Sequence, residues 1–295
     1  MKKYFIIIPI LVLVYFLSGK DNSSIKTENK RIETDNLIVN MTNYGMENIL
    51  LSEYLNGVVA CEMPALFHDE AIKAGIVAAR TFYLYKYESD KDYKPSNGDQ
   101  CYFSESKRKE NWKDNYELYN EKILNNINLT KNEVITYDGN LIKAFYFSMS
   151  NGYTEDAVNV FKKSEPYLVS VISVFDKDVK NNLSNKSISV NEFKEKLNVD
   201  NDIVINNIVR DSSNRVSEIV INNVNYDGVY FRKLFDLRST DFEIEFNDQE
   251  VIITTRGYGH GVGMSQWGAN EMAKMGYEYR DILKYYYKDV EIMYK

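Results

Sequence analysis

Glu62 is the residue whose neighbours most favour acid chemistry. It lies in "NGVVACEMPALF", where small and apolar residues precede it and Pro64 follows it. A carboxyl group among apolar neighbours has its ionised form disfavoured, so its pKa rises and it can act as a general acid. The alternative is an exposed glutamate at the end of a helix that stops before Pro64. The residue types alone leave both interpretations open.

A second candidate is the glycine-rich stretch "GYGHGVGMSQWGA", residues 257–269, which contains His260, Ser265 and Gln266. It lacks the G-x-x-x-x-G-K-S/T pattern of phosphate-binding loops and the setting of a Rossmann turn. The sequence has only two histidines, which disfavours a zinc site built on histidines. No G-x-S-x-G elbow is present, which disfavours a Ser-His-Asp hydrolase. A loop in which the glycines only make a tight bend is the plain alternative.

Two further sets of polar residues could contact a ligand. Lys73 and Arg80 share one face of a predicted helix, and a guanidinium buried in "VAARTF" would need a partner. This face could position a carboxylate or a sugar oxygen, or it could be an ordinary salt-bridged surface. Ser148 and Ser150 alternate in "FYFSMSNGYTED" at a strand exit. Hydroxyls there suit sugar recognition, although a plain turn fits equally well.

The elements that must position these residues predict an α+β fold with mixed sheets and several helices. A short helix precedes Pro64, and a longer one is expected over 69–87, with acidic residues in its first turn. A hairpin should turn at 138–139, an Asp-Gly pair between β-rich flanks. The tail predicts two short helices separated at Gly276.

Other stretches read mainly as strands. Residues 37–42 and 166–175 have apolar patterns that predict strands. Residues 177–250 begin with a segment rich in asparagine and lysine and continue with several stretches in which apolar and polar residues alternate. Residues 177–250 could form a small α+β lobe of their own, although no linker rich in proline, glycine or serine marks the borders of this range. The main domain is expected to cover residues 37–295.

The first 20 residues predict an export segment. Two lysines precede an unbroken apolar run in "MKKYFIIIPILVLVYFLSGK", and no small-residue cleavage site follows it. We expect residues 1–20 to be a membrane signal anchor, while a cleaved signal peptide stays open because the run is short for a span. Residues 21–36 are polar and predict a tether. The domain that follows is expected outside the cytoplasm, close to a membrane.

Charge and cysteine content exclude some functions and leave others open. The formal net charge of −7 is a poor basis for binding nucleic acid. Two cysteines in an exported chain suggest one disulfide, but a single widely separated pair is no disulfide framework. We therefore expect Cys61 to be a packing residue rather than half of a bridge with Cys101.

Four segments together resemble the stage II sporulation protein D (SpoIID) family of peptidoglycan lytic transglycosylases. They are "YLNGVVACEMPALFHDEAIKAGIVAARTFYLYK", "ITYDGNLIKAFYFSMSNGYTED", "FRKLFDLRSTDFEI" and "RGYGHGVGMSQWGANEMAKMGYEYRDILKYYY", in the family's order over most of residues 50–290. The resemblance implies that Glu62 is the catalytic acid. It also implies substrate-binding roles for these residues: Lys73, Arg80, Ser148, Ser150, His260, Ser265 and Gln266.

The resemblance implies a reaction that needs one carboxyl group where ordinary glycosidases use two. Glu62 would protonate the oxygen that joins N-acetylmuramic acid to N-acetylglucosamine, and the muramoyl C6 hydroxyl would then close a 1,6-anhydro ring. The implied substrate is glycan stripped of stem peptides during septal thinning and engulfment. The implied partners are an amidase and a membrane scaffold protein at the mother-cell membrane of the sporulation septum.

The chain also departs from the family pattern. Some relatives bind zinc through a cysteine and a nearby histidine, but Cys101 has no histidine close by in sequence, so we expect no metal and no cofactor. "SMSNG" replaces the usual Ser-Thr-Ser-Gly-Gly but keeps both serines. The alternative hypotheses are a glycan-binding module without turnover and an activator of a cell-wall amidase.

Overall fold

The structure is a computed structural model in which residues 34–247 and 249–295 are described. The expected anchor, residues 1–20, and most of the expected tether, 21–36, lie outside these residues. Within the described ranges, no helix is both long enough and apolar enough to cross a membrane.

Helices and short strands occur largely in separate runs along the chain, such as α1 to α4 and then β3 to β6, which agrees with the predicted α+β class. The α-helices are α1 (Leu51–Glu62), α2 (Asp69–Ser89), α3 (Glu105–Trp112), α4 (Tyr116–Leu129), α5 (Ala157–Phe161), α6 (Val190–Leu197), α7 (Gly228–Leu234), α8 (Gln266–Lys274) and α9 (Tyr279–Tyr286). The strands are β1 (Ile38–Val39), β2 (Ile49–Leu50), β3 (Glu133–Tyr137), β4 (Asn140–Leu141), β5 (Tyr146–Phe147), β6 (Gly152–Tyr153), β7 (Ile172–Ser173), β8 (Leu183–Ser189), β9 (Ile205–Arg210), β10 (Val216–Ile221), β11 (Val224–Asp227), β12 (Phe242–Phe246), β13 (Glu250–Arg256), β14 (Met264–Ser265) and β15 (Glu291–Tyr294).

Helices α1 and α2 are separated by the proline break that the sequence predicts. Helix α1 ends just before Met63, whose extended backbone is the conformation that a following proline favours. Helix α2 begins after His68, whose Nδ1 accepts a hydrogen bond from the Glu70 N–H at 3.3 Å. The helices pack closely, because a Cβ added at Gly75 would lie 2.2 Å from the sulfur of Met63. Both predicted helices are confirmed.

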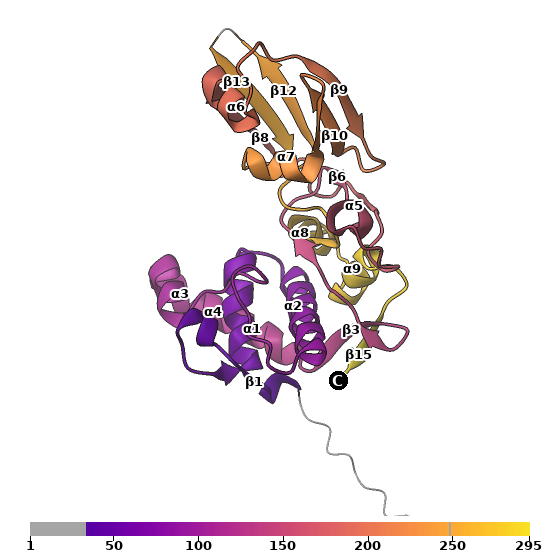
Figure 1. Cartoon of the computed structure of the whole chain (residues 1–295). Helices are drawn as coiled ribbons and strands as arrows, with labels where there is room; N and C mark the ends of the chain where they lie inside the picture. Colours follow the sequence, from indigo (N-terminus) through magenta and orange to yellow (C-terminus); the bar gives the residue numbers. More distant parts are fainter. Residues whose placement is uncertain (1–33, 248) are drawn as a thin grey trace, which may run out of the picture. The chain divides into compact units, whose positions relative to one another are not determined.

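The larger hydrophobic core is formed by helices and one small sheet. Helices α1, α2 and α4 contact one another, and α2 also contacts α8, α9 and β3 (Figure 1). Strand β3 pairs antiparallel with β15 on one side and with β4 on the other. The β3–β4 hairpin turns at 138–139, as predicted, and α8 and α9 confirm the two tail helices.

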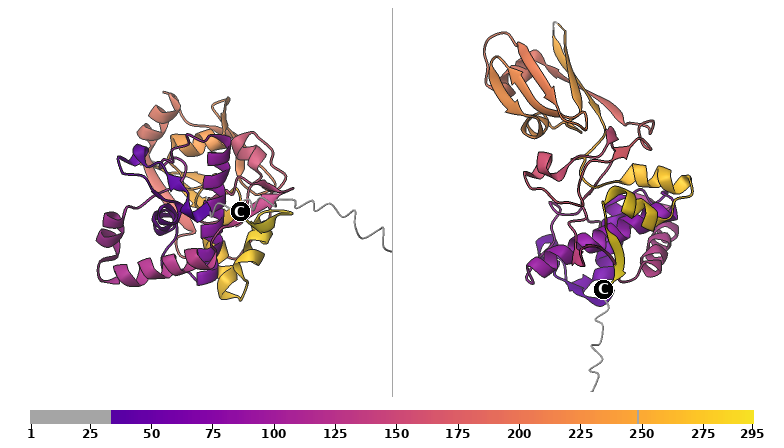
Figure 2. Two further views of the ribbon diagram at one scale, coloured as in Figure 1. Left: turned by 90° about the horizontal axis from the view of Figure 1, so that it is seen from below. Right: turned by 90° about the vertical axis from the view of Figure 1, so that its right-hand side faces the viewer.

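A second hydrophobic cluster is formed entirely by residues 188–253. Two antiparallel three-stranded sheets, β12-β13-β8 and β11-β10-β9, surround it together with α6 and α7 (Figure 2). Phe193 stacks on Phe235 with ring centroids 4.7 Å apart, and Phe231 stacks on Phe242 at 5.0 Å. All four rings are fully buried, each contributing roughly 2–3 kcal/mol of hydrophobic free energy. Both clusters belong to one compact unit of the described chain.

Two predicted strands are much shorter than the sequence suggests. Only Ile38–Val39 forms a strand within 37–42, and only Ile172–Ser173 within 166–175. In the second stretch Leu168 is buried, but its carbonyl accepts from the Ala157 N–H and belongs to no ladder. An apolar pattern alone therefore does not distinguish a strand from irregular chain that buries some of its side chains.

The glycine-rich loop runs beside β5. Strand β14 pairs parallel with β5, and Tyr258 forms an isolated bridge with Met149. Gly263 has φ 80°, and a Cβ there would lie 2.0 Å from the backbone oxygen of Phe145. Only glycine allows this approach, which places the start of α8 next to the end of α1.

Candidate active site

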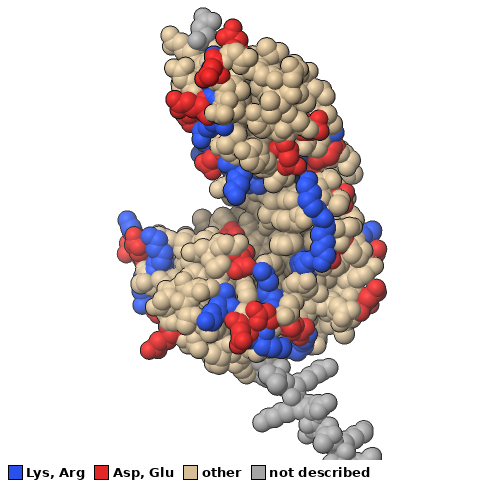
Figure 3. All heavy atoms as spheres, viewed as in Figure 1, with Lys and Arg blue, Asp and Glu red and all other residues tan. Residues whose placement is uncertain are grey.

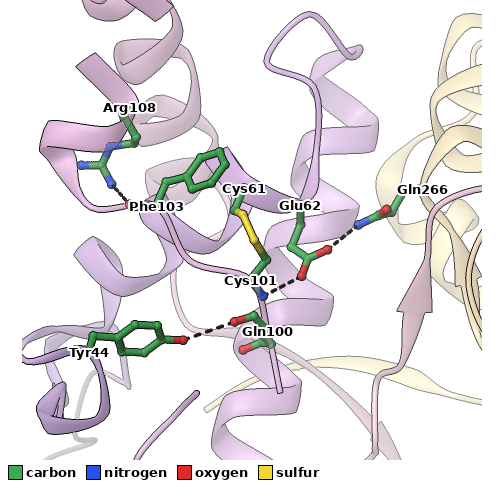
Figure 4. The surroundings of a disulfide bond; sticks show 8 residues. All are labelled: Tyr44, Cys61, Glu62, Gln100, Cys101, Phe103, Arg108 and Gln266. Atoms are coloured by element: carbon green, nitrogen blue, oxygen red, sulfur yellow. Dashed lines mark hydrogen bonds between the residues drawn. A yellow bond between two sulfur atoms is a disulfide. The ribbon is translucent and has the colours of Figure 1, made fainter. Parts of the chain in front are cut away.

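Glu62 is held at the C-terminal end of α1 by two hydrogen bonds. Its Oε1 accepts from the Cys101 backbone N–H at 2.8 Å, and its Oε2 accepts from Gln266 Nε2 at 3.3 Å (Figure 4). The side chains of Val58, Met63 and Met264 line the small apolar space beside it. The carboxyl group is therefore fixed in position, in the apolar surroundings that the sequence suggested.

Burial raises the pKa of Glu62 above its ordinary value. The hydrogen bonds from Cys101 and Gln266 act in the opposite direction, because they stabilise the ionised form, but burial dominates. The negative end of the α1 dipole also disfavours a carboxylate at this position. The protonated form of Glu62 is thus favoured to a higher pH than in a free glutamate.

Cys61 and Cys101 form a disulfide, so the expectation that Cys61 only packs is wrong. Their Cα atoms lie 5.6 Å apart, within the usual range for a bridge. The bridge joins the residue before Glu62 to the residue whose N–H binds it (Figure 4). The donor and the acid are therefore tied together by a covalent bond. Sequence separation gave no sign of this, because the contact depends on how the 90–104 segment folds back on α1.

A cleft of about 690 Å³ opens beside Glu62, a volume within the range of about 300–1,000 Å³ of ligand pockets. Polar, charged and aromatic side chains from six separate segments surround it. The lining residues are Glu62, Phe82, Tyr85, Lys86, Gly98, Asp99, Gln100, Lys143, Ala144, Phe145, Tyr146, Phe161, Lys163 and His260. The cleft thus combines one acid of raised pKa with ring faces and ammonium groups.

Gln100 is a lining residue of the cleft that is held by several hydrogen bonds. Its Nε2 donates to the Tyr146 hydroxyl at 3.0 Å, and its Oε1 accepts from the Tyr54 hydroxyl at 3.3 Å. Its backbone oxygen accepts from the Tyr44 hydroxyl at 3.3 Å (Figure 4). With backbone and side chain both bonded, Gln100 holds the neighbouring Cys101 N–H toward Glu62.

His260 lines the same cleft as Glu62, and the backbone holds its ring in place. Nδ1 accepts from the Val262 N–H at 3.0 Å, and the ring also hydrogen-bonds the Tyr146 backbone. Burial, with the charges of Arg232 and Arg215, lowers the pKa of His260 to about 4. The ring is therefore neutral at pH 7 and presents its edge among Phe145 and other aromatic rings.

The predicted serines surround a different carboxyl group, that of Asp176. Ser150 donates from its N–H at 2.7 Å and from its Oγ at 2.6 Å, and Ser265 Oγ donates at 2.6 Å. Ser150, Ser265 and Asp176 are completely buried. Ser148 contributes its backbone oxygen, which accepts from the Trp267 N–H at 3.1 Å. Ser150 and Ser265 thus bind a buried carboxyl group, none of the three serines lines the cleft, and their expected sugar-binding role stays a prediction.

Lys73 and Arg80 also lie away from the cleft. Lys73 forms an ion pair with Glu70 and lies 5.0 Å from the ring centroid of Tyr279. Arg80 is fully buried, and its Nε and Nη2 donate to the two carboxylate oxygens of Asp35 at 2.6 and 2.9 Å. The buried guanidinium has its partner within the chain, and neither Lys73 nor Arg80 lines this cleft.

Several lining residues were missed by sequence reasoning. Lys143, Phe145 and Tyr146 belong to a stretch already noted for its serines, and the density of aromatic rings there was the available signal. Gln100 gave no signal, because its role depends on distant tyrosines. Across the residues that the structure describes, no group of three or more His, Cys, Asp or Glu side chains is arranged to hold a metal ion. Basic and acidic side chains are interspersed on the face viewed in Figure 3.

Comparison with known proteins places the chain among sporulation proteins. The family described as SpoIID, stage II sporulation protein, matches residues 41–137, which include Glu62 and Cys101. Stage II sporulation protein D of Bacillus amyloliquefaciens is 40% identical over 262 residues, covering 85% of this chain and 76% of the relative. That of Bacillus subtilis is 35% identical over 314 residues, covering 97% and 92%.

A protein named amidase enhancer, also from Bacillus subtilis, is 29% identical over 290 residues. That match covers 79% of this chain but 39% of the relative. The two sporulation proteins match over most of their own length, and Glu62 lies within the residues that the family matches. The chain belongs to the SpoIID family of stage II sporulation proteins.

Proposed function

We propose that this protein is a lytic transglycosylase that cleaves the bond between N-acetylmuramic acid and N-acetylglucosamine in stem-peptide-free glycan strands. The observation that carries the proposal is Glu62, a fixed acid of raised pKa that opens onto a cleft of ligand size. Ring faces of Phe145 and Phe161, stacked with centroids 4.7 Å apart, offer apolar surface for sugar rings. Family membership supports a role in sporulation.

In the proposed reaction, Glu62 acts first as acid and then as base. Its proton goes to the glycosidic oxygen, and the bond to muramoyl C1 breaks as positive charge develops on the ring. The resulting carboxylate takes the proton of the muramoyl C6 hydroxyl, whose oxygen bonds to C1 and closes the 1,6-anhydro ring. Glu62 ends as it began, and no water is consumed. The Gln266 and Cys101 donors would stabilise the carboxylate that exists between the two steps.

The second carboxyl of the lining, Asp99, is poorly suited to act as a nucleophile. Its Oδ1 lies 3.0 Å from Lys86 Nζ, and its Oδ2 accepts from Ser96 Oγ at 2.8 Å. Burial raises the pKa of Asp99, but these two partners outweigh burial and leave it lowered. A carboxylate stabilised in this way is a weak nucleophile, which favours attack by the substrate's own hydroxyl.

Mass spectrometry of products from stem-peptide-free glycan tests the proposal. The wild type should release strands ending in 1,6-anhydro-muramic acid, and Glu62→Gln should lose turnover by about 1,000-fold or more. Asp99→Asn is the matched control and should retain the same products. Reducing-end products that depend on Asp99 would instead identify a hydrolase with two carboxyl groups.

The alternative is an activator of a cell-wall amidase, which the name of one relative suggests. An activator would raise amidase release of stem peptides while leaving strand length unchanged, and Glu62→Gln would not affect it. In the proposed function an amidase supplies the stripped strands. A membrane scaffold would hold the two enzymes together on the outer side of the mother-cell membrane. Co-purification of the amidase with full-length protein tests that partnership.

A further inference from the structure

The cleft is more basic than the protein that contains it. The whole chain has a net charge of −7, yet Lys86, Lys143 and Lys163 line the space beside Glu62. Positive groups gathered in the cleft of an acidic protein produce a local field that attracts anions. The arrangement of these lysines indicates where an anion would bind.

Lys86 is already neutralised, and the other two lysines share one acid. Lys86 Nζ lies 3.0 Å from Asp99. Lys143 Nζ and Lys163 Nζ both approach Oε1 of Glu165, at 2.6 and 3.6 Å. Among the described residues, this pair of ammonium groups therefore carries a surplus positive charge.

Glu165 is fixed, so it cannot move to neutralise one lysine and then the other. Its second oxygen accepts from the Tyr167 hydroxyl at 3.1 Å, and that hydroxyl accepts from the Lys143 N–H at 3.2 Å. Burial lowers the pKa of Lys143, but the hydrogen bond to Glu165 outweighs it and leaves the pKa raised. Lys143 is therefore charged and positioned.

The two lysines differ in their freedom to meet a ligand. The side chain of Lys143 is 19% exposed, whereas that of Lys163 is 68% exposed and lies 3.6 Å from its partner oxygen. Lys163 can therefore turn toward a bound anion while Lys143 stays on Glu165. Phe145 and Phe161 also line the cleft, so the best fit is an anionic group attached to a ring that has an apolar face.

We propose that Lys143 and Lys163 form a subsite for the lactyl carboxylate of a stem-peptide-free muramic acid residue. This inference rests on the proposed function for the identity of the glycan. When a stem peptide is attached, the lactyl group is an amide without charge, and the subsite loses its ionic partner. The lysine pair thus selects strands from which an amidase has removed the peptides.

Binding to Glu62→Gln protein tests the subsite without any need for turnover. Calorimetry would compare a short stripped glycan with the same glycan whose lactyl carboxylates have been converted to methylamides. We expect the free carboxylate to bind about fivefold to tenfold more tightly, with the preference weakening as salt is raised. Lys163→Met and the Lys143→Met/Lys163→Met pair should each reduce the preference, the pair to less than about twofold.

Lys162→Met is the matched control, because Lys162 is adjacent in sequence, equally exposed and paired with Asp227 outside the cleft. It should leave the preference unchanged. Equal binding of the two glycans to the parent, or an unchanged preference in Lys163→Met and in the pair, would overturn the subsite. Product analysis of the wild type is a separate result, so failure of the chemistry would not be mistaken for failure of the subsite.

Discussion

The carboxyl groups of Glu62 and Asp176 share the same physical perturbation but differ in access. Burial raises the pKa of both. Asp176 is completely enclosed, and its oxygens accept three hydrogen bonds from Ser150 and Ser265. Glu62 accepts two hydrogen bonds and opens onto the cleft.

This difference indicates that the serine and glycine motifs position the site residues and do not line the cleft at Ser150 or Ser265. Asp176 joins the strand exit at Ser150 to the start of α8 at Ser265, and α8 begins with Gln266, which donates to Glu62. The buried carboxyl therefore acts on the exposed one through the position of a helix. A perturbed pKa marks both groups, but only accessibility separates the reactive one from the structural one.

The largest predicted effect on stability belongs to Asp176. Asp176→Ala should lower the free energy of unfolding by about 3 kcal/mol, because it leaves the buried Ser150 N–H without its acceptor and removes the bonds from the Ser150 and Ser265 hydroxyls. Urea denaturation followed by circular dichroism measures the loss. A change below about 1 kcal/mol would contradict the structural role.

Glu62→Gln is the counterpart, and its effect on stability depends on pH. Folding raises the pKa of Glu62 from about 4.5, so the folded protein binds the carboxyl proton more tightly than the unfolded chain does. This proton binding stabilises the fold at low pH. That contribution is lost as pH rises through the raised value. The free energy of unfolding of the variant should therefore equal that of the wild type at low pH. It should be larger above the raised pKa of Glu62, where the wild type must bury a charge.

Removal of the disulfide should have the next largest effect. Cys61→Ala/Cys101→Ala should cost about 3 kcal/mol of stability, since a bridge that closes a loop of this length restricts the unfolded chain. Turnover should fall as well, because the Cys101 N–H is no longer tied to Glu62. A reducing agent should reproduce both effects in the wild type and change nothing in the variant. Full turnover of the reduced wild type would show that the bridge does not position the acid.

The smallest effect concerns the pH profile. Gln266→Leu removes a hydrogen bond that lowers the pKa of Glu62, so the alkaline limb of kcat/KM should move to higher pH. Lys274→Gln, an exposed change on the same helix, should leave the limb in place. A shift to lower pH, or none, would mean that Gln266 does not bind the ionised acid.

The sequence predicts what depends on neighbours along the chain. The break at Pro64, the helix over 69–87 and the turn at 138–139 all follow from local residue types, and the apolar setting of Glu62 follows in the same way. Asp176 and the Cys61–Cys101 bridge depend on segments that meet only after folding. Residue types showed which side chains were buried or polar, but not which distant partner each one would meet.

The ion pair between Arg80 and Asp35 has a mechanical consequence. Asp35 lies at the start of the described chain, and its two bonds to Arg80 fasten that start to the middle of α2. Thr34 adds a bond to Asn132 at 3.2 Å. A force applied to the chain before residue 34 would act first on this buried ion pair. The tension would pass into α2, and the strands that follow residue 34 would not be separated from their partners.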